Sequence, residues 1–259
     1  MIEERSSRTP FGLWTIHAVT VTSDAEGCAD RPTVVLVHGL GMSTRSLLPT
    51  ARRLADDFRV VIPELPGSGN SSRPAQVLDV PGLAEALIGW MDGVGLERAV
   101  LVGHSLGSQV AVHAAGRHPG RITGLVLVSP SRDPLIGTPW KKAWRLLLDG
   151  PRESPGLLLV AVVDYLRAGP VRMWKTLKAS LDTDPVRTLG RVRQPTLVVR
   201  GDRDPLVSPW WASTICRLVG DGRTVTVDGG PHGLPFSRPA DLVRAIRPFL
   251  YEVASSPRP

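Results

Sequence analysis

The sequence predicts an α/β fold in which helices cover both faces of a mostly parallel β-sheet. Short β-rich segments alternate with helical stretches along the chain, and this order is typical of βαβ units. Several of the β-rich segments are nearly continuous in Val, Leu and Ile, as expected for strands that are buried on both faces. The chain has 259 residues, 42% of them hydrophobic and 21% charged, which is enough for one large globular domain with a substantial core.

The strands and core helices are predicted from these patterns. The first strand alternates apolar and polar residues, so we expect it to be an antiparallel edge strand. The expected strands are Leu13–Thr22, Thr33–His38, Arg59–Pro63, Ala99–Gly103, Ile122–Ser129, Thr196–Gly201 and Thr224–Asp228. The expected core helices are Ser46–Asp56, Val80–Gly93, Leu106–His118, Pro209–Val219 and Pro239–Val253.

One segment, residues 132–190, interrupts the alternation because it has no strand signal and several helical pieces. The pieces are Pro139–Asp149, Pro155–Ala168, Pro170–Leu181 and Pro185–Gly190. We expect a helical lid here, inserted between core residues 1–131 and 191–253, with residues 254–259 as a disordered tail. A lid above the carboxyl edge of the sheet would cover a site there. The aromatic residues of this segment are candidates for lining the substrate pocket, with at most two of them facing substrate: Trp140, Trp144, Tyr165 and Trp174.

Charge and composition limit the classes of partner. The net charge is +7, but the basic residues are spread singly and 27 of 31 are arginine, so no nucleic-acid partner is expected. The first ten residues have no apolar signal region, and the apolar stretch Gly156–Val163 is too short to span a bilayer, so we expect a cytoplasmic protein. Cys28 and Cys216 lie far apart and are expected to be free thiols. No group of residues has metal-ligand spacing, so neither a metal nor a cofactor is expected.

The strongest motif is Gly103-His104-Ser105-Leu106-Gly107, which directly follows the apolar segment Ala99–Val102. A G-x-S-x-G sequence between a strand and a helix is typical of a nucleophile elbow, in which a strained turn projects the serine hydroxyl above the sheet. The N-terminus of the following helix favours a negative oxygen nearby, which suits attack on an acyl carbon. The alternative interpretation is a glycine-rich turn whose serine caps the helix.

Three further motifs accompany the elbow in chain order. They are Val37-His38-Gly39-Leu40-Gly41, the loop Pro63–Ser71, and Gly201-Asp202-Arg203-Asp204-Pro205 followed by Gly230-Pro231-His232. Together the four motifs resemble the α/β-hydrolase fold superfamily, in its branch of serine esterases and C–C hydrolases with a helical lid. The loop departs from the family pattern at Glu64, where Asp is commoner, but this position does not take part in the chemistry.

The resemblance implies a catalytic triad of Ser105, Asp204 and His232. In such a triad the histidine takes the serine proton and later delivers it to the leaving group, while the aspartate orients the imidazole and stabilises its cation. Asp202 and Asp133 are the other candidates for the acid.

The oxyanion would be bound by two backbone N–H groups, those of Leu40 and Leu106. His38 and Gly39 are further candidates for the pocket, and we expect His38 to brace its loop rather than to transfer protons.

The predicted function is that of a serine hydrolase that cleaves a carboxylic ester, thioester or lactone of a small to medium apolar acyl substrate through an acyl-enzyme on Ser105. The alternatives are C–C hydrolysis of ring-cleavage products, acyl transfer or thioester release on carrier-bound acyl groups, and a non-catalytic binding protein. Residues 132–190 contain ten Lys or Arg and six Asp or Glu. This basic lid could attract an acidic acyl carrier or a lipid surface, although a solvated helix face has the same pattern. No feature predicts an oligomeric state.

Overall fold

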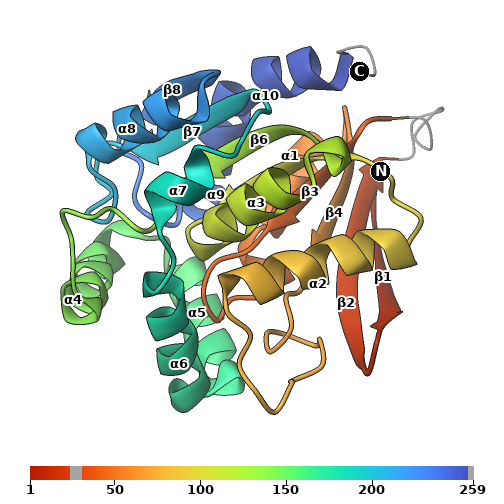
Figure 1. Cartoon of the computed structure of the whole chain (residues 1–259), viewed down its shortest axis with the longest axis horizontal. Helices are drawn as coiled ribbons and strands as arrows, with labels where there is room; N and C mark the ends of the chain where they lie inside the picture. Colours follow the sequence, from red (N-terminus) through yellow and green to blue (C-terminus); the bar gives the residue numbers. More distant parts are fainter. Residues whose placement is uncertain (24–30, 256–259) are drawn as a thin grey trace.

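The computed structural model describes residues 1–23 and 31–255, and these residues form one eight-stranded sheet with helices on both faces (Figure 1). The strand order is β1-β2-β4-β3-β5-β6-β7-β8, and only the pairs β1–β2 and β2–β4 are antiparallel. This confirms the predicted fold class. The strands are β1 (Ile2–Phe11), β2 (Trp14–Ser23), β3 (Thr33–Val37), β4 (Arg59–Pro63), β5 (Ala99–His104), β6 (Ile122–Val128), β7 (Thr196–Gly201) and β8 (Gly222–Val227).

The sheet edge differs from the sequence prediction. The strand expected at the edge is β2, but β1 pairs with its outer side from Ile2↔Ser23 to Phe11↔Trp14, so β2 lies one strand further in. The residues of β1 are mostly polar and mostly exposed, so this segment has little of the hydrophobic alternation by which a strand is recognised. Backbone pairing with β2 defines the strand instead.

The apolar strand residues alternate between two cores, one on each face of the sheet. In β3, Val35 and Val37 join the core on one face of the sheet, whereas Val34 and Leu36 join the core on the other. Because successive strand side chains point to opposite faces, a strand covered on both faces needs apolar residues at nearly every position. This explains the continuous Val and Leu segments of the sequence.

The core helices follow the predicted segments with small shifts at their ends. The predicted Ser46–Asp56 helix is a 3₁₀ turn, Thr44–Ser46, followed by α1, and the last helix runs to Ser255, two residues past its predicted end. The other four residues of the predicted tail lie outside the described residues, as does Cys28. The core helices are α1 (Leu48–Leu54), α2 (Val80–Gly93), α3 (Leu106–Arg117), α8 (Pro209–Val219), α9 (Leu234–Ser237) and α10 (Pro239–Ser255).

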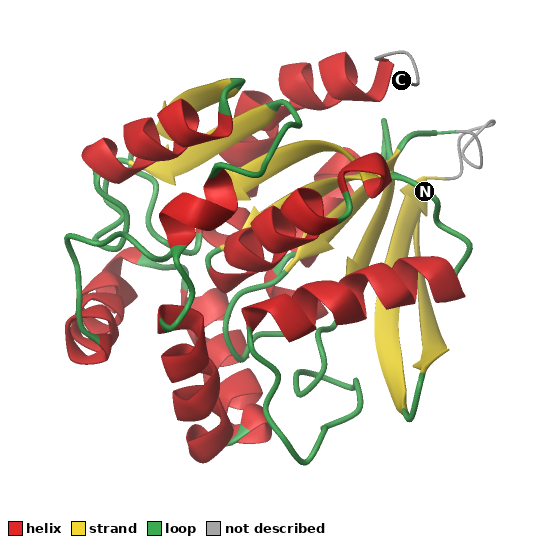
Figure 2. Cartoon of the chain, viewed as in Figure 1, coloured by secondary structure: helices red, strands yellow, loops and turns green. Residues whose placement is uncertain are grey.

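Four helices between β6 and β7 occupy the segment without strand signal, and we call this segment, residues 132–190, the helical insert. They are α4 (Pro139–Asp149), α5 (Pro155–Ala168), α6 (Pro170–Leu181) and α7 (Pro185–Leu189). Each begins with proline, whose fixed φ suits a first helical turn. Figures 1 and 2 show α4, α5 and α6 projecting away from the layered core. In the described part of the chain, no helix has the length and apolar character needed to cross a membrane.

Candidate active site

Ser105 lies in the turn between β5 and α3 and has a positive φ of 54°, a conformation that non-glycine residues rarely adopt. Glycines make this turn possible. A Cβ on Gly107 would lie 2.1 Å from the carbonyl oxygen of Val37, and one on Gly103 would lie 2.5 Å from that of Gly107. The G-x-S-x-G spacing is therefore required by close backbone contacts, and the turn directs Ser105 to the carboxyl edge of the sheet.

The side chains of Ser105, His232 and Asp204 meet at this edge. Nε2 of His232 lies 3.0 Å from Oγ of Ser105, and Nδ1 lies 3.2 and 3.1 Å from the two carboxylate oxygens of Asp204. His232 follows β8 and Asp204 follows β7, so parallel strands bring their ends to the same place. A hydroxyl bonded to an imidazole that is oriented by a carboxylate can be activated as a nucleophile.

The electrostatics of this group favour a positive charge on the imidazole. Burial works against the charged ring, but the charge and hydrogen bond of Asp204, with the charges of Asp149 and Glu153, raise the pKa of His232 above its ordinary value. Burial would raise the pKa of Asp204, but His232 and the backbone N–H of Leu206, 2.8 Å from Oδ1, lower it. Asp204 is therefore ionised at neutral pH and stabilises an imidazolium ion.

The two other acids considered from the sequence lie in different surroundings. Asp202 is exposed, whereas Asp204 is buried against the ring of His232. Asp133 is fully buried, but its oxygens accept the backbone N–H groups of Leu135 and Ser208, each at 2.9 Å. Asp133 therefore fixes the loops that precede α4 and α8.

His38 orders the loop that contains Gly39 and Leu40. Its Nε2 accepts the backbone N–H of Leu65 at 3.0 Å, so Nδ1 carries the proton and donates to the carbonyl of Gly39 at 2.8 Å. Burial lowers the pKa of His38 and keeps the ring neutral. In a trans peptide the carbonyl and the following N–H point in opposite directions. Fixing the Gly39 carbonyl therefore fixes the direction of the Leu40 N–H.

The N–H of Leu106 is supplied by the start of α3. Leu106 is the first residue of this helix, so its N–H has no carbonyl partner one turn earlier in the helix. Leu40 and Leu106 both line a hollow of about 430 Å³, part of it open to solvent. A Cβ on Gly39 would lie 3.4 Å from Cβ of Ser105, so this end of the hollow adjoins the serine.

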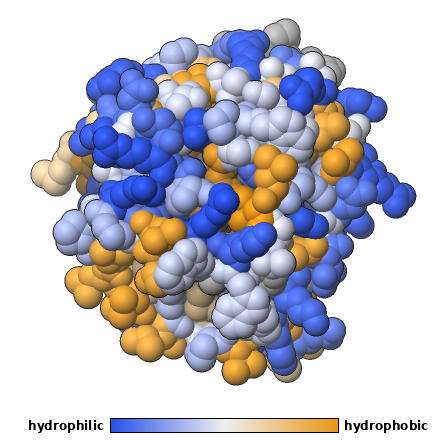
Figure 3. Space-filling model, turned by 90° about the vertical axis from the view of Figure 1, so that its left-hand side faces the viewer, coloured by the Kyte–Doolittle hydropathy of each residue, from blue (hydrophilic) through white to orange (hydrophobic). Residues whose placement is uncertain are grey.

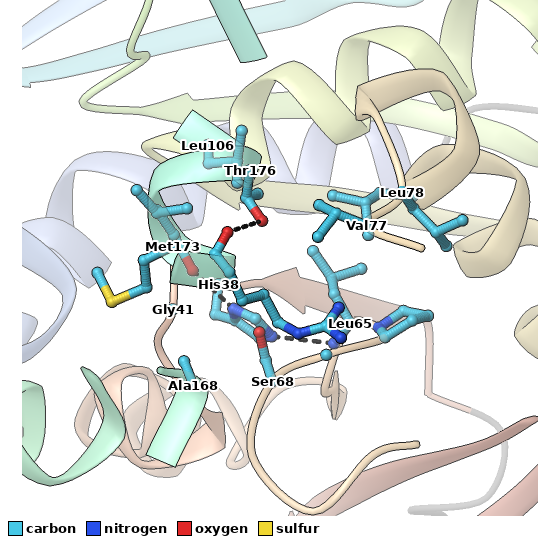
Figure 4. A pocket seen from close by; sticks show the side chains of 16 residues that line it. His38, Gly41, Leu65, Ser68, Val77, Leu78, Leu106, Ala168, Met173 and Thr176 are labelled. Atoms are coloured by element: carbon cyan, nitrogen blue, oxygen red, sulfur yellow. Dashed lines mark hydrogen bonds between the residues drawn. The ribbon is translucent and has the colours of Figure 1, made fainter. Parts of the chain in front are cut away.

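Most of the residues that line the hollow are apolar or glycine, and the polar ones are His38, Ser68, Arg172 and Thr176. Figure 4 shows Val77 and Leu78 on one side and Met173 and Ala168 on the other, with Leu65 near His38. Arg172 also lines the hollow and donates to the carbonyl of Pro74 at 2.6 Å. The lining suits an apolar acyl chain better than a polar one.

None of the four aromatic residues that we expect to line the substrate pocket is among the residues that line this hollow. Trp140, Trp144 and Trp174 are 74%, 61% and 45% exposed, since α4 and the outer side of α6 face solvent. Tyr165 packs against the loop of Leu40, where a Cβ on Gly41 would lie 3.1 Å from its ring. Helical amphipathicity alone does not show which side of an insert packs on the core.

Two carboxylates of the insert, which sequence reasoning missed, contact the loop of His232. Oδ2 of Asp149 accepts the backbone N–H of His232 at 2.8 Å, and Glu153 accepts the backbone N–H of Gly233 and, at 2.5 Å, the hydroxyl of Ser237. Burial, together with the neighbouring Asp149, raises the pKa of Glu153 to about 7. No sequence pattern indicates this contact, because both residues look like ordinary acids of a solvated helical segment.

Glu64, the position that departs from the family pattern, is a buried acceptor for three segments. Its carboxylate accepts the backbone N–H of Thr44 at 3.1 Å and that of Asn70 at 2.6 Å, and it pairs with Nδ1 of His17 at 3.0 Å. The longer side chain thus ties β2 and two loops together beside the hollow. Its part is structural, because none of these contacts involves Ser105 or His232.

The match to a family model decides the relationship of this chain: the model of the Alpha/beta hydrolase family covers residues 34–245. The chain belongs to this family. Its fold and the resemblance found in its motifs are thereby confirmed, and the protein is a hydrolase-family enzyme.

Proteins that are similar to this chain in sequence or in structure are named for several different activities. The carbamate hydrolase RutD of Caulobacter sp. strain K31 is 29% identical over 86% of this chain and 91% of the relative. The pimeloyl-[acyl-carrier protein] methyl ester esterase of Stenotrophomonas maltophilia strain R551-3 is 28% identical over 83% and 90%. The solved hydrolase BphD of Rhodococcus sp. strain RHA1, which acts on 2-hydroxy-6-oxo-6-phenylhexa-2,4-dienoate, has a TM-score of 0.77 at 23% identity, with 99% and 100% covered. The last shows a common fold alone.

Proposed function

We propose that this protein is a serine hydrolase that cleaves carboxylic esters of small to medium apolar acyl groups. The observation that carries the proposal is the hydrogen-bonded series from Oγ of Ser105 through His232 to Asp204, with distances of 3.0 and 3.1 Å. A serine that only capped α3 would need neither the strained turn nor a buried imidazole on its hydroxyl. The Ser105 side chain makes no hydrogen bond to the N-terminus of this helix.

The proposed reaction starts with attack of Ser105 Oγ on the acyl carbon while Nε2 of His232 takes its proton. The backbone N–H groups of Leu40 and Leu106 stabilise the negative oxygen that develops. His232 then protonates the leaving alcohol, which departs and leaves an acyl-enzyme on Ser105. A water molecule, deprotonated by His232, hydrolyses this ester and regenerates the serine.

The apolar lining of the hollow supports an acyl chain rather than a sugar or a nucleotide as the bound part of the substrate. The Stenotrophomonas relative is named as an ester hydrolase, which supports ester cleavage within this family. A substrate screen should also include lactones, thioesters, a carrier-linked acyl ester and C–C hydrolase substrates, because the same serine chemistry applies to each.

The test is Ser105→Ala, with Ser7→Ala on the exposed edge strand β1 as the matched control. Hydrolysis of p-nitrophenyl butyrate should fall on the order of 10⁴-fold or more in Ser105→Ala and stay unchanged in Ser7→Ala. A fluorophosphonate should label the wild-type and control proteins at Ser105 and leave Ser105→Ala unlabelled. Unchanged turnover in a folded Ser105→Ala protein would reject the proposal.

A further inference from the structure

The outer faces of the helical insert expose an unusual amount of apolar side chain. The exposed residues recur at helical spacing in each helix, so they form stripes rather than isolated positions. They are Trp140, Trp144, Leu147 and Leu148 in α4, Leu158, Leu159, Val162 and Leu166 in α5, and Val171 and Trp174 in α6. The rings of Trp140 and Trp174 lie 5.7 Å apart and connect the stripes of α4 and α6.

Figure 3 shows apolar side chains gathered at the lower left of the molecule, at the level at which Figure 1 places α4, α5 and α6. The upper part of the same face is mainly hydrophilic. A large exposed apolar patch marks a surface that meets another apolar phase or partner.

Within α4, α5 and α6 themselves the exposed charges have one sign, and the exposed acids Asp182 and Asp184 follow only after α6 ends. The only acids of α4, α5 and α6 are Asp149 and Asp164, and both are buried. Asp149 binds the His232 loop, and Asp164 accepts the backbone N–H of Ser43 at 2.9 Å. The exposed charged side chains described on these helices are therefore basic: Lys141, Arg167, Lys175 and Lys178.

We propose that α4, α5 and α6 form a docking surface for an anionic lipid bilayer. Tryptophan and leucine enter the boundary between headgroups and acyl chains, while lysine and arginine pair with anionic headgroups. A second copy of the chain would bring like charges together. A small acidic carrier protein would neutralise the lysines but leave much of the apolar area in water. A bilayer provides anionic headgroups for the basic side chains and an apolar interior for the exposed apolar stripes.

The opposite side of α4 reaches the candidate active site. Nη1 of Arg145 donates to the carbonyl of Pro205 at 2.7 Å, next to Asp204, and Asp149 holds the N–H of His232. The proposed surface thus lies on the same helix that contacts both loops. Supply of a lipid-borne acyl substrate through this surface rests on the proposed function, whereas lipid binding itself does not.

The experiment measures flotation of the full chain with vesicles of phosphatidylcholine, with and without phosphatidylglycerol. The wild type should bind the vesicles that contain phosphatidylglycerol at low salt, and high salt should weaken this binding. The Trp144→Ser/Leu147→Ser variant should bind at least about tenfold more weakly, because two large apolar side chains no longer enter the bilayer. The fully exposed Leu13, in the turn between β1 and β2, lies outside the insert and supplies the matched control Leu13→Ser, which should bind like wild type.

A Lys175→Glu/Lys178→Glu variant separates the charge from the apolar contribution and should also lose binding to anionic vesicles. Circular dichroism checks that each variant is folded, and Ser105→Ala should bind lipid normally whatever its activity. Absence of binding to anionic vesicles at low salt would overturn the proposal. Equal binding of the wild type and the Trp144→Ser/Leu147→Ser variant would also overturn it. So would the finding that Trp144 is buried in a dimer, or that these residues bind an acidic carrier protein and not vesicles.

Discussion

Replacing Glu153 with glutamine should change how the stability of this protein depends on pH. Glu153 accepts the N–H of Gly233 through Oε1 and the hydroxyl of Ser237 through Oε2. Glutamine has nearly the same shape, so its amide oxygen keeps the Gly233 contact and its NH₂ group donates to Ser237 or Asp149. The substitution therefore imitates the protonated carboxyl group and removes only its titration.

The magnitude follows from the raised pKa of Glu153, which burial and Asp149 move from 4.5 to about 7. Between these values the folded protein holds a proton that the unfolded chain has lost, so the free energy of unfolding falls as pH rises. This change in the pKa of Glu153 corresponds to about 3 kcal/mol of unfolding free energy at most, since solvent near the half-buried side chain screens part of the effect. Glu153→Gln should therefore match wild type near pH 4.5 and exceed its stability by up to about 3 kcal/mol above pH 7.

The assay is urea denaturation of both proteins at a series of pH values from acid to mildly alkaline. Asp182→Asn, which neutralises an exposed acid of the same insert, is the matched control and should follow the wild-type curve. Glu153→Ala loses the acceptor for Gly233 as well as the charge, so it should be less stable than Glu153→Gln at every pH.

Parallel pH curves for wild type and Glu153→Gln would refute this reasoning, because they would show that Glu153 titrates as it does in the unfolded chain. A variant that is uniformly less stable would instead show that the charge itself holds the loop of His232. Either result would show that Glu153 is not protonated where it contacts this loop.

Two further predictions concern the pH profile and the elbow. The pKa of His232 is raised and its neutral form must accept the serine proton, so kcat/KM should rise with pH through a midpoint above 6.5; a midpoint at or below 6.5 would contradict this. Gly107→Ala places a Cβ 2.1 Å from the carbonyl oxygen of Val37 and should cost about 3 kcal/mol or more in thermal unfolding. Gly120→Ala, with nothing within 4 Å of the added carbon, should cost much less, and equal losses would show that contact with Val37 is not the cause.

The parallel strands were predictable because they are buried on both faces, and burial leaves a continuous apolar signal such as Val34–Val37. The edge strand β1 was not, because its residues Ile2–Phe11 are mostly exposed and pairing with β2 alone gives them their structure. Hydrophobic patterning records burial and does not record backbone pairing.

The positions of Ser105 and His232 were predictable because each belongs to a local motif whose glycines are fixed by close backbone contacts, whereas the motif that contains Asp204 also contains Asp202. The contacts of Asp149 and Glu153 were not, since they join residues about 80 positions apart, 83 for Asp149 and 80 for Glu153, and need no special local sequence. The aromatic residues of the insert show the same limit, because their helical spacing fits a pocket and an exposed face equally well.

The sequence by itself determined the order of strands β2 to β8 and of the main helices along the chain, the elbow at Ser105 and the family, since these depend on local conformation and on apolar periodicity. Only the tertiary structure decided that Asp204 rather than Asp202 or Asp133 lies against His232, that two insert carboxylates hold its loop, and that Trp140 and Trp144 face outward. The physical reason is that hydrogen bonds and solvent exposure depend on how distant segments pack, and side-chain identity along the chain does not specify that packing.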